Sequence, residues 1–379
     1  METDQKKERM IGMDYQQIGT AARIKDGIQN VLFRRRILSS FAAAALYLKS
    51  RGGKRMSPYF RSVLEQYVPQ ERYADRTYMK KLCRQLFFTH CCYAANYHEF
   101  FMYDFGELTE PERAEFLCWH ELEGYYRKLN AMGRPEIFDD KAKAMETFRD
   151  FTGRDAVVIR EASQREEFLS FVAAHPVSFL KPLKDFGGNG IRRLLSSATP
   201  ESLTPYLEQC PFLVEEGIVQ APGMAQFCPT SVNTIRYNTF YHDGKLTRLQ
   251  AVIRMGRSGS FVDNATAGGL YAPVDLQTGR ILSPAKSDFG ETYEVHPDTG
   301  LRFEGTQIPQ WDELNDLVER IVRVVPEQKQ VGWDFALSTG GWVMVEGNTF
   351  AGLQCFSQRR GMRRLITEAF GEAIPVVRR

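Results

Sequence analysis

The chain has 379 residues, of which 43% are hydrophobic and 25% charged, and its formal net charge is +2. These proportions are typical of a globular protein with two or three domains, and no internal repeat or low-complexity tract argues otherwise. No window approaches the roughly 18 uninterrupted apolar residues of a membrane helix, and the polar N-terminus lacks a signal-peptide core. Seven cysteines without a CxxC pair favour reduced thiols. We therefore expect a cytoplasmic protein without a transmembrane segment.

The first predicted domain, residues 1–135, is mostly helical from residue 14 to about 130. Between residues 21 and 62 it carries ten lysines and arginines against one acidic residue, Asp26. Such a segment could face an anionic membrane or polymer, or it could be the solvated face of a helix. The sequence Met132-Gly-Arg-Pro135 suits a domain boundary.

The second predicted domain, residues 136–216, is a small α+β unit. Ser163 and Glu166 form a candidate capping box that begins a helix ending near residue 175. A further helix is expected over residues 140–148, and strands are expected over 156–159, 177–182, 191–195 and 211–216.

The third predicted domain comprises residues 217–379. Strands are expected over residues 234–241, 246–255, 333–337 and 342–346. Apolar residues recur with helical spacing between Leu314 and Val325, which predicts an amphipathic helix. A closing helix is expected from residue 359 to about 370.

The last two strands suggest a hairpin that holds divalent metal. A three-residue loop, Thr339 to Gly341, would place Gly341 at the position needing positive φ and Asp334 opposite Glu346. Asn348 lies two residues farther on and shares that face. Carboxylate and amide oxygens are the ligands that Mg²⁺ prefers. The alternative is an ordinary hairpin with polar residues on its wet face.

A second motif places Lys181 at a strand end before a loop containing Gly187, Gly188 and Gly190. Backbone amides of such a loop can point at phosphate oxygens, and the lysine adds positive charge. The spacing matches neither a Walker A motif nor a dinucleotide fingerprint. Glycine-rich turns are common, so this motif is weak alone.

Two further segments suit nucleotide and substrate binding. The strand from Leu213 to Gln220 could form a hinge between two lobes, a common place for adenine. Arg236 and Arg254 lie near strand ends, followed by Asn264 and the pair Gly268–Gly269, and they could clamp phosphate or carboxylate. Arginines on a wet sheet face are the alternative.

In this order the motifs resemble the ATP-grasp superfamily. Residues from about 95 to 370 look most like its sugar-transfer associated group, and the arrangement is also similar to ribosomal-protein glutamate ligases. The segments that carry the resemblance are Ser231–Arg236, Val262–Gly269, Val274–Gly279, His296–Gly300, Gly332–Asp334 and Val345–Asn348. The resemblance implies an α+β, ATP-grasp fold of two lobes after the helical N-terminal domain.

The resemblance also implies roles for single residues. Asp334, Glu346 and Asn348 would hold two Mg²⁺ ions, and Arg254 would neutralise the transferred phosphate. ATP would be bound by Lys141, Lys181, Gly187, Gly188, Gly190, Glu215, Glu216, Ile218, Gly268 and Gly269. Arg236 and Asn264 would face substrate. The acidic ribose ligand common in the family is missing between Gln220 and Gly223.

The implied function is an ATP-dependent carboxylate–amine ligase that forms an amide through an acyl phosphate. Its substrates would be a small-molecule or peptide carboxylate and an amine. One alternative is a small-molecule kinase with the same grip on ATP. The other is a non-catalytic nucleotide-binding module whose basic N-terminal helices dock on an anionic partner.

Overall fold

The structure is a computed structural model that describes residues 57–184, 190–257, 259, 268–288, 290–352 and 361–370. Its contacts divide the chain into two compact units, one comprising Met1–Gly124 with Ser357–Arg379 and the other Tyr125–Phe356. The three-domain division expected from the sequence stays a prediction. Most of the basic segment, residues 21–56, lies outside the described residues.

The N-terminal unit is helical where it is described. Its helices are α4 (Pro58–Tyr67), η3 (Gln70–Ala74), α5 (Arg76–Tyr93), α6 (Tyr97–Met102), α7 (Glu110–Ala114), the beginning of α8 (Trp119–Ala131) and α16 (Arg363–Phe370). Aromatic rings fill the core: Phe60 stacks on Phe87 with centroids 5.1 Å apart, and Tyr97 meets Phe60 edge-on at 4.6 Å. The Arg363 guanidinium donates to the carbonyls of Ala114 and Phe116, which fixes α16 within this unit.

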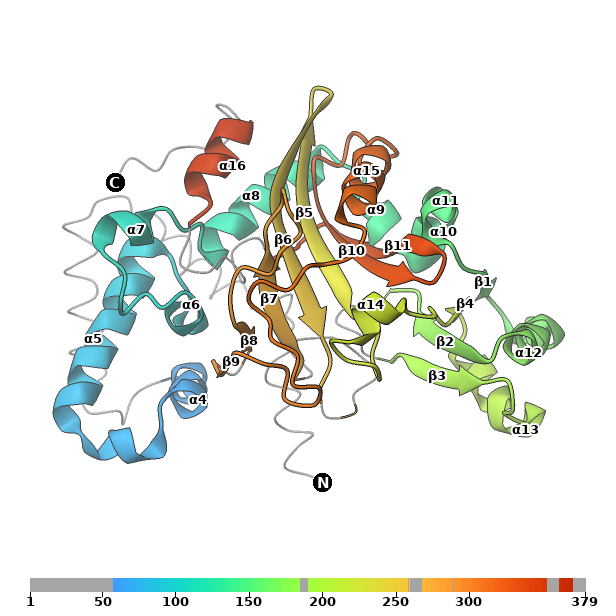
Figure 1. The fold of residues 1–379 in the computed structure, drawn as a ribbon, viewed down its shortest axis with the longest axis horizontal. Coiled ribbons are helices and arrows are strands. Elements are labelled where there is room, and N and C mark those ends of the chain that lie inside the picture. Colours follow the sequence, from blue (N-terminus) through green and yellow to red (C-terminus); the bar gives the residue numbers. More distant parts are fainter. Residues whose placement is uncertain are drawn as a thin grey trace. The chain divides into compact units, whose positions relative to one another are not determined.

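The second unit contains two antiparallel sheets (Figure 1). The smaller has the order β1-β4-β2-β3, formed by Ala156–Ile159, Phe212–Glu216, Val177–Pro182 and Arg192–Leu195. Phe168 and Val172 of α12 (Arg165–Ala174) pack on one face of this sheet, against Phe212 and Val214 of β4. The remaining helices between Pro135 and Gln209 are α9 (Pro135–Phe138), α10 (Lys141–Thr147), α11 (Arg149–Thr152), η4 (Ala162–Gln164), α13 (Pro200–Leu203) and η5 (Thr204–Gln209).

The larger sheet has the order β11-β10-β5-β6-β7-β8-β9. Its strands are β5 (Thr234–His242), β6 (Lys245–Met255), β7 (Leu270–Val274), β8 (Ala285–Ser287), β9 (Thr292–Tyr293), β10 (Gln330–Ser338) and β11 (Gly341–Asn348), and α14 (Pro222–Ala225) precedes β5. Successive strand residues point to opposite faces, so the sheet separates apolar from polar side chains.

The apolar face of the larger sheet packs on α15 (Trp311–Ile321). Leu314, Val318 and Ile321 of this helix are fully buried in a core shared with Ile235 and Phe335. Burial of each such side chain contributes about 1.5–3 kcal/mol to the stability of the folded state, and this packing holds the helix against the apolar face of the sheet. The helix predicted from apolar spacing at 314–325 is therefore present, although it begins and ends a few residues earlier.

Three sequence expectations need correction. The capping box near residue 163 pairs Glu161 with Gln164, and α12 begins at Arg165. The β10–β11 connection has two residues, not three, because Ser338 pairs with Gly341. Strands β7 to β9 were not expected, because they are short and β7 contains Pro273. The α+β class is confirmed, and within the described part of the chain each helix is too short or too polar to span a bilayer.

Candidate functional site

The β10–β11 hairpin brings the three predicted metal ligands to one face. Asp334 pairs with Glu346 and Gly332 pairs with Asn348. The two-residue loop alone would shift this register, but Val345 is an extra residue in β11 and restores it. The Asn348 amide donates to Asp334 Oδ2 at 3.4 Å and to Glu346 Oε1 at 3.3 Å. The three side chains therefore converge.

Two arginines from neighbouring strands bind the Asp334 carboxylate, which is completely buried. Arg236 lies opposite Asp334 on β5 and forms a bidentate pair with it, with Nη2 2.9 Å from Oδ2. Arg254 of β6 places Nη2 3.0 Å from the same oxygen and also donates to Thr234 Oγ1. The arginine pair predicted from the sequence thus shares one acidic partner.

The two carboxylates of the hairpin have opposite protonation tendencies. Burial alone would raise the pKa of Asp334, but Arg236 and Arg254 outweigh burial and hold this pKa below its ordinary value. The pKa of Glu346 is raised, because surrounding protein excludes water from its carboxylate and because Asp334 lies beside it. The Glu346 side chain still reaches solvent. A neighbouring cation would remove the repulsion between the two carboxylates.

This donor set suits Mg²⁺. Two carboxylates and an amide supply hard oxygen ligands on rigid strands. Burial, and then the adjacent Asp334 carboxylate, raise the pKa of Glu346, and a bound cation would favour the charged form of this carboxylate. The Asn348 amide would have to rotate to offer its oxygen, because its nitrogen now faces both carboxylates.

The predicted phosphate lysine lies in the smaller sheet as part of a buried charge group. Lys181 of β2 forms an ion pair with Glu215 of β4, and Arg154 Nη2 donates to the same carboxylate at 2.9 Å. Burial alone would raise the pKa of Glu215. The charges of Arg154 and Lys181 lower this pKa by more than burial raises it, and the pKa therefore lies below its ordinary value. The Glu215 side chain was expected beside adenine, and in this structure it binds two cationic side chains.

Arg154 also links this group to the metal-ligand hairpin. Its Nη1 donates to the Met344 carbonyl at 2.7 Å, and its Nη2 lies 3.4 Å from the Val345 carbonyl, the residue before Glu346. Sequence reasoning missed Arg154, and it also missed Thr234 beneath Arg254. Arg154 belongs to no recognisable motif, because its importance depends on strands that are distant in sequence. Thr234 lies within the segment Ser231–Arg236, but its contact with Arg254 depends on the pairing of β5 with β6.

The other predicted residues are less closely gathered. Lys141 begins α10, and its backbone amide donates to the Leu183 carbonyl just after β2. Glu216 directs a carboxylate oxygen to the Asp155 amide at 3.3 Å. Ile218 is half-buried after β4. Gly190 has φ +73° and Gly268 has φ +92°. Gly268 and Gly269 immediately precede β7, three positions along the sheet from β10, while Gly187, Gly188 and Asn264 lie outside the described residues.

Comparison with known proteins supports the resemblance over part of the chain. Residues 194–368 match the model of the sugar-transfer associated ATP-grasp family, which confirms the expected family for this segment. A search of curated proteins finds no match to the chain.

Similar solved structures share little sequence with the chain. D-alanyl-alanine synthetase A from Vibrio cholerae is 13% identical, covering 63% of this chain and 64% of its own, with a TM-score of 0.41. L-amino acid ligase from Bacillus licheniformis is 11% identical, covering 64% and 51%, with a TM-score of 0.40. The biotin carboxylase domain of Hydrogenobacter thermophilus 2-oxoglutarate carboxylase is 14% identical, covering 66% and 51%, with a TM-score of 0.42. The chain therefore spans less than two thirds of each of these structures.

Proposed function

We propose that this chain, whose residues 194–368 match the sugar-transfer associated ATP-grasp family, is an ATP-dependent carboxylate–amine ligase. The observation that carries the proposal is the convergence of Asp334, Glu346 and Asn348 on one face of the hairpin. Arg154 joins the Met344–Val345 backbone of that hairpin to the Lys181–Glu215 pair. Predicted metal ligands and the predicted phosphate lysine thus belong to one connected group.

In the proposed reaction a substrate carboxylate oxygen attacks the γ-phosphorus of ATP, and ADP leaves. The amine nitrogen then attacks the acyl carbon, phosphate leaves, and the nitrogen loses a proton. The anionic carboxylate and the triphosphate repel each other, so the site must supply positive charge. Mg²⁺ held by Asp334, Glu346 and Asn348 would neutralise phosphate oxygens when bound.

Residues of the chain would orient the substrates. Arg236 and Arg254 are already fixed by Asp334, so their guanidinium groups would meet an anionic group without reorganisation. Lys181 would contact phosphate from the neighbouring sheet after exchanging part of its interaction with Glu215. No covalent protein nucleophile is required for either step.

The proposal is tested with purified full-length protein, ATP, Mg²⁺ and a panel of carboxylates, with hydroxylamine as the nucleophile. An acyl phosphate is intercepted as a hydroxamate, accompanied by equimolar ADP and phosphate. A kinase would instead give ADP and a stable phosphorylated product without hydroxamate. A nucleotide-binding module would bind ATP without turnover.

Glu346→Gln should abolish hydroxamate formation, because it removes a charged metal ligand. Glu319→Gln is the matched control, since Glu319 of α15 is half-exposed and pairs with Arg248 of β6. Equal activity of Glu346→Gln and the natural chain would exclude the proposed metal site. A panel that releases no phosphate with any substrate would contradict the ligase itself.

A further inference from the structure

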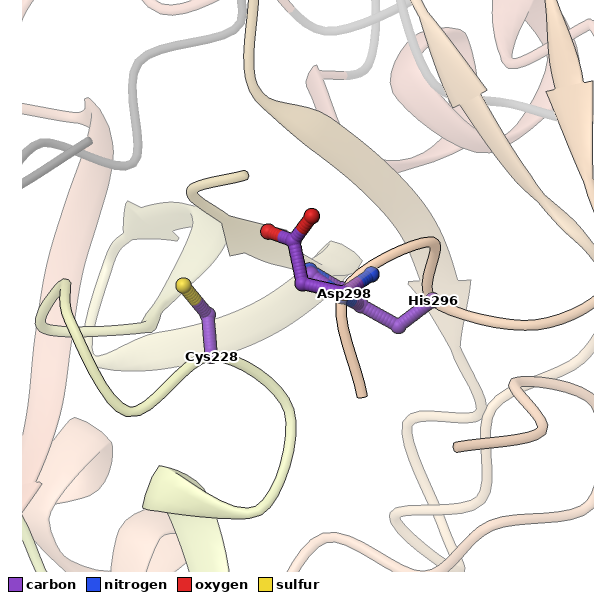
Figure 2. A group of neighbouring side chains, drawn as sticks. All are labelled: Cys228, His296 and Asp298. Atoms are coloured by element: carbon purple, nitrogen blue, oxygen red, sulfur yellow. The ribbon is translucent and has the colours of Figure 1, made fainter. Parts of the chain in front are cut away.

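Two groups of metal-ligating side chains occur among the described residues outside the proposed active site. Figure 2 shows the first, in which Cys228, His296 and Asp298 come together. Both ring nitrogens of His296 already have hydrogen-bond partners. Nε2 donates to the Gly256 carbonyl at 2.9 Å, and Nδ1 accepts a hydrogen bond from the Asp298 amide at 3.2 Å. This histidine serves as a structural link between a turn and the end of β6, and the group offers no imidazole lone pair to a metal.

The second group consists of Asp155, His175 and Glu216, with ligand atoms all within 4.8 Å of one another. His175 Nδ1 lies 2.8 Å from the Phe171 carbonyl. A carbonyl can only accept, so Nδ1 carries a hydrogen, and Nε2 is the nitrogen that can coordinate a cation. Nε2 faces Asp155 Oδ2 at 3.4 Å, with the Glu216 carboxylate nearby. A metal ion between Nε2 and the two carboxylates would attract all three ligands and would replace the proton through which Nε2 can donate to Asp155.

The backbone holds these three residues on rigid elements. The Glu216 amide donates to the Asp155 carbonyl at 2.9 Å, which extends the β1–β4 pairing by one residue. His175 ends α12, and its ring packs on Phe171 with centroids 4.4 Å apart. The His175 side chain is 14% exposed, whereas that of Asp155 is 79% exposed. One ligand is therefore fixed by packing, and solvent reaches the group from the Asp155 side.

From this geometry we infer that Asp155, His175 and Glu216 bind a divalent transition metal ion of the Zn²⁺ class. Ligand atoms about 2.1 Å from a tetrahedral Zn²⁺ lie about 3.4 Å from each other. Asp155 Oδ2 and His175 Nε2 already have this separation, 3.4 Å. The flexible Glu216 side chain would move slightly to complete the set, and water would take the fourth position. A histidine whose other nitrogen donates to a carbonyl is the usual arrangement of a metal ligand.

This site is distinct from the proposed Mg²⁺ site in position and chemistry. Glu215 and Glu216 are successive strand residues, so their side chains leave opposite faces of the smaller sheet. Glu215 binds Lys181 and Arg154, while Glu216 lies on the face that α12 covers. The nitrogen ligand favours Zn²⁺, Co²⁺ or Ni²⁺ over Mg²⁺. The metal would join the end of α12 to β1 and β4 and so stabilise the smaller sheet.

The test is a Co²⁺ titration of the untagged full-length chain after removal of metals with a chelator. We expect one Co²⁺ per chain with visible d–d absorption, displaced by Zn²⁺ but not by millimolar Mg²⁺. His175→Gln should raise the Kd at least about tenfold and remove the rise in Tm that the metal causes. The matched control is His242→Gln, because His242 pairs with an aspartate at 3.2 Å but belongs to neither three-residue group.

Asp155→Asn provides a second variant, because Asp155 is exposed and its replacement does not disturb the core. It should weaken Co²⁺ binding while the metal-free protein unfolds at an unchanged temperature. Absence of Co²⁺ binding, or equal binding by both variants and the natural chain, would overturn the inference. An intense thiolate-to-cobalt band that Cys228→Ser removes would also overturn it, by placing the metal at the group in Figure 2.

Discussion

At the scale of single residues, Arg154 connects the two sheets of the second unit. It is 6% exposed and binds the Glu215 carboxylate together with carbonyls of Thr152 and Met344. A buried carboxylate destabilises the fold if its cationic partners are removed, because its charge is then left uncompensated away from water. The geometry of the proposed phosphate lysine therefore depends on an arginine that no motif includes.

Arg154→Met should lower the free energy of unfolding by about 3 kcal/mol or more, because Glu215 would keep only Lys181 as a buried cationic partner. Urea unfolding followed by tryptophan fluorescence measures the change. Arg134→Gln serves as the control, since the Arg134–Glu136 pair is exposed on both sides. Similar midpoints for the two variants would mean that Arg154 does not stabilise the charge group.

At the scale of elements, the two-residue β10–β11 turn and the extra residue Val345 together set the register that places Glu346 beside Asp334. Gly341 has φ +115°, a conformation that L-residues rarely adopt, and an added Cβ there would meet no neighbouring atom. Gly340, its neighbour in the turn, lacks positive φ, and an added Cβ would lie in ordinary contact with Ser338 Oγ. An alanine at either position would therefore cause no steric clash, and a comparison of the two variants isolates the effect of backbone strain at Gly341.

Gly341→Ala should destabilise the protein by about 1–3 kcal/mol through backbone strain, whereas Gly340→Ala should leave the unfolding midpoint nearly unchanged. Thermal unfolding of both variants checks this. A loss of nucleotide turnover in Gly341→Ala larger than its loss of folded protein would show that the register also positions the site. Equal stability of the two variants would show that the turn relaxes without strain.

At the same scale, the stability of helix α6 depends on pH. Glu99 in α6 accepts hydrogen bonds from Asn96 and Trp119 amides and from the Tyr103 hydroxyl. Burial raises its pKa to about 7, despite the opposing effect of these hydrogen bonds. The folded state thus binds a proton more tightly than the unfolded state, whose glutamate pKa is about 4.3.

Stability from this proton is fully present below the unfolded pKa and is lost as pH rises through about 7. We expect the N-terminal unit to unfold more readily at pH 8 than at pH 5. In Glu99→Gln the contribution of this group to the pH dependence should vanish. Circular dichroism melts at both pH values measure it, and an identical pH dependence in the variant would contradict the assignment to Glu99.

At the scale of the whole molecule, the predicted nucleotide and metal residues that the structure describes lie between Lys141 and Asn348, within one compact unit. Nucleotide binding should therefore slow hydrogen exchange in β2, β4, β10 and β11. Amides of α4 and α5 should exchange at unchanged rates. Exchange mass spectrometry with Mg²⁺ and a non-hydrolysable ATP analogue measures both, and protection confined to α4 and α5 would contradict the proposed site.

The predicted pairing of Asp334 with Glu346 is present, but it arises from a two-residue loop with the extra residue Val345 and not from the predicted three-residue loop. The sequence by itself determined the strands of the hairpin and the amphipathic α15. These features follow from local periodicity, which the chain displays without any tertiary context. It also contained the motifs whose resemblance the family match confirmed for residues 194–368.

Only the tertiary structure decided which charged side chains share partners. Arg236 and Arg254 meet at Asp334 because β5 lies between β6 and β10, and Lys181 meets Arg154 at Glu215 because β4 lies between β1 and β2. Strand order across long connections leaves no trace in local residue patterns. For the same reason His175, Asp155 and Glu216 gave no signal in the sequence: the backbone pairing beside β1 and β4 places Asp155 next to Glu216, and the packing of α12 on this sheet adds His175.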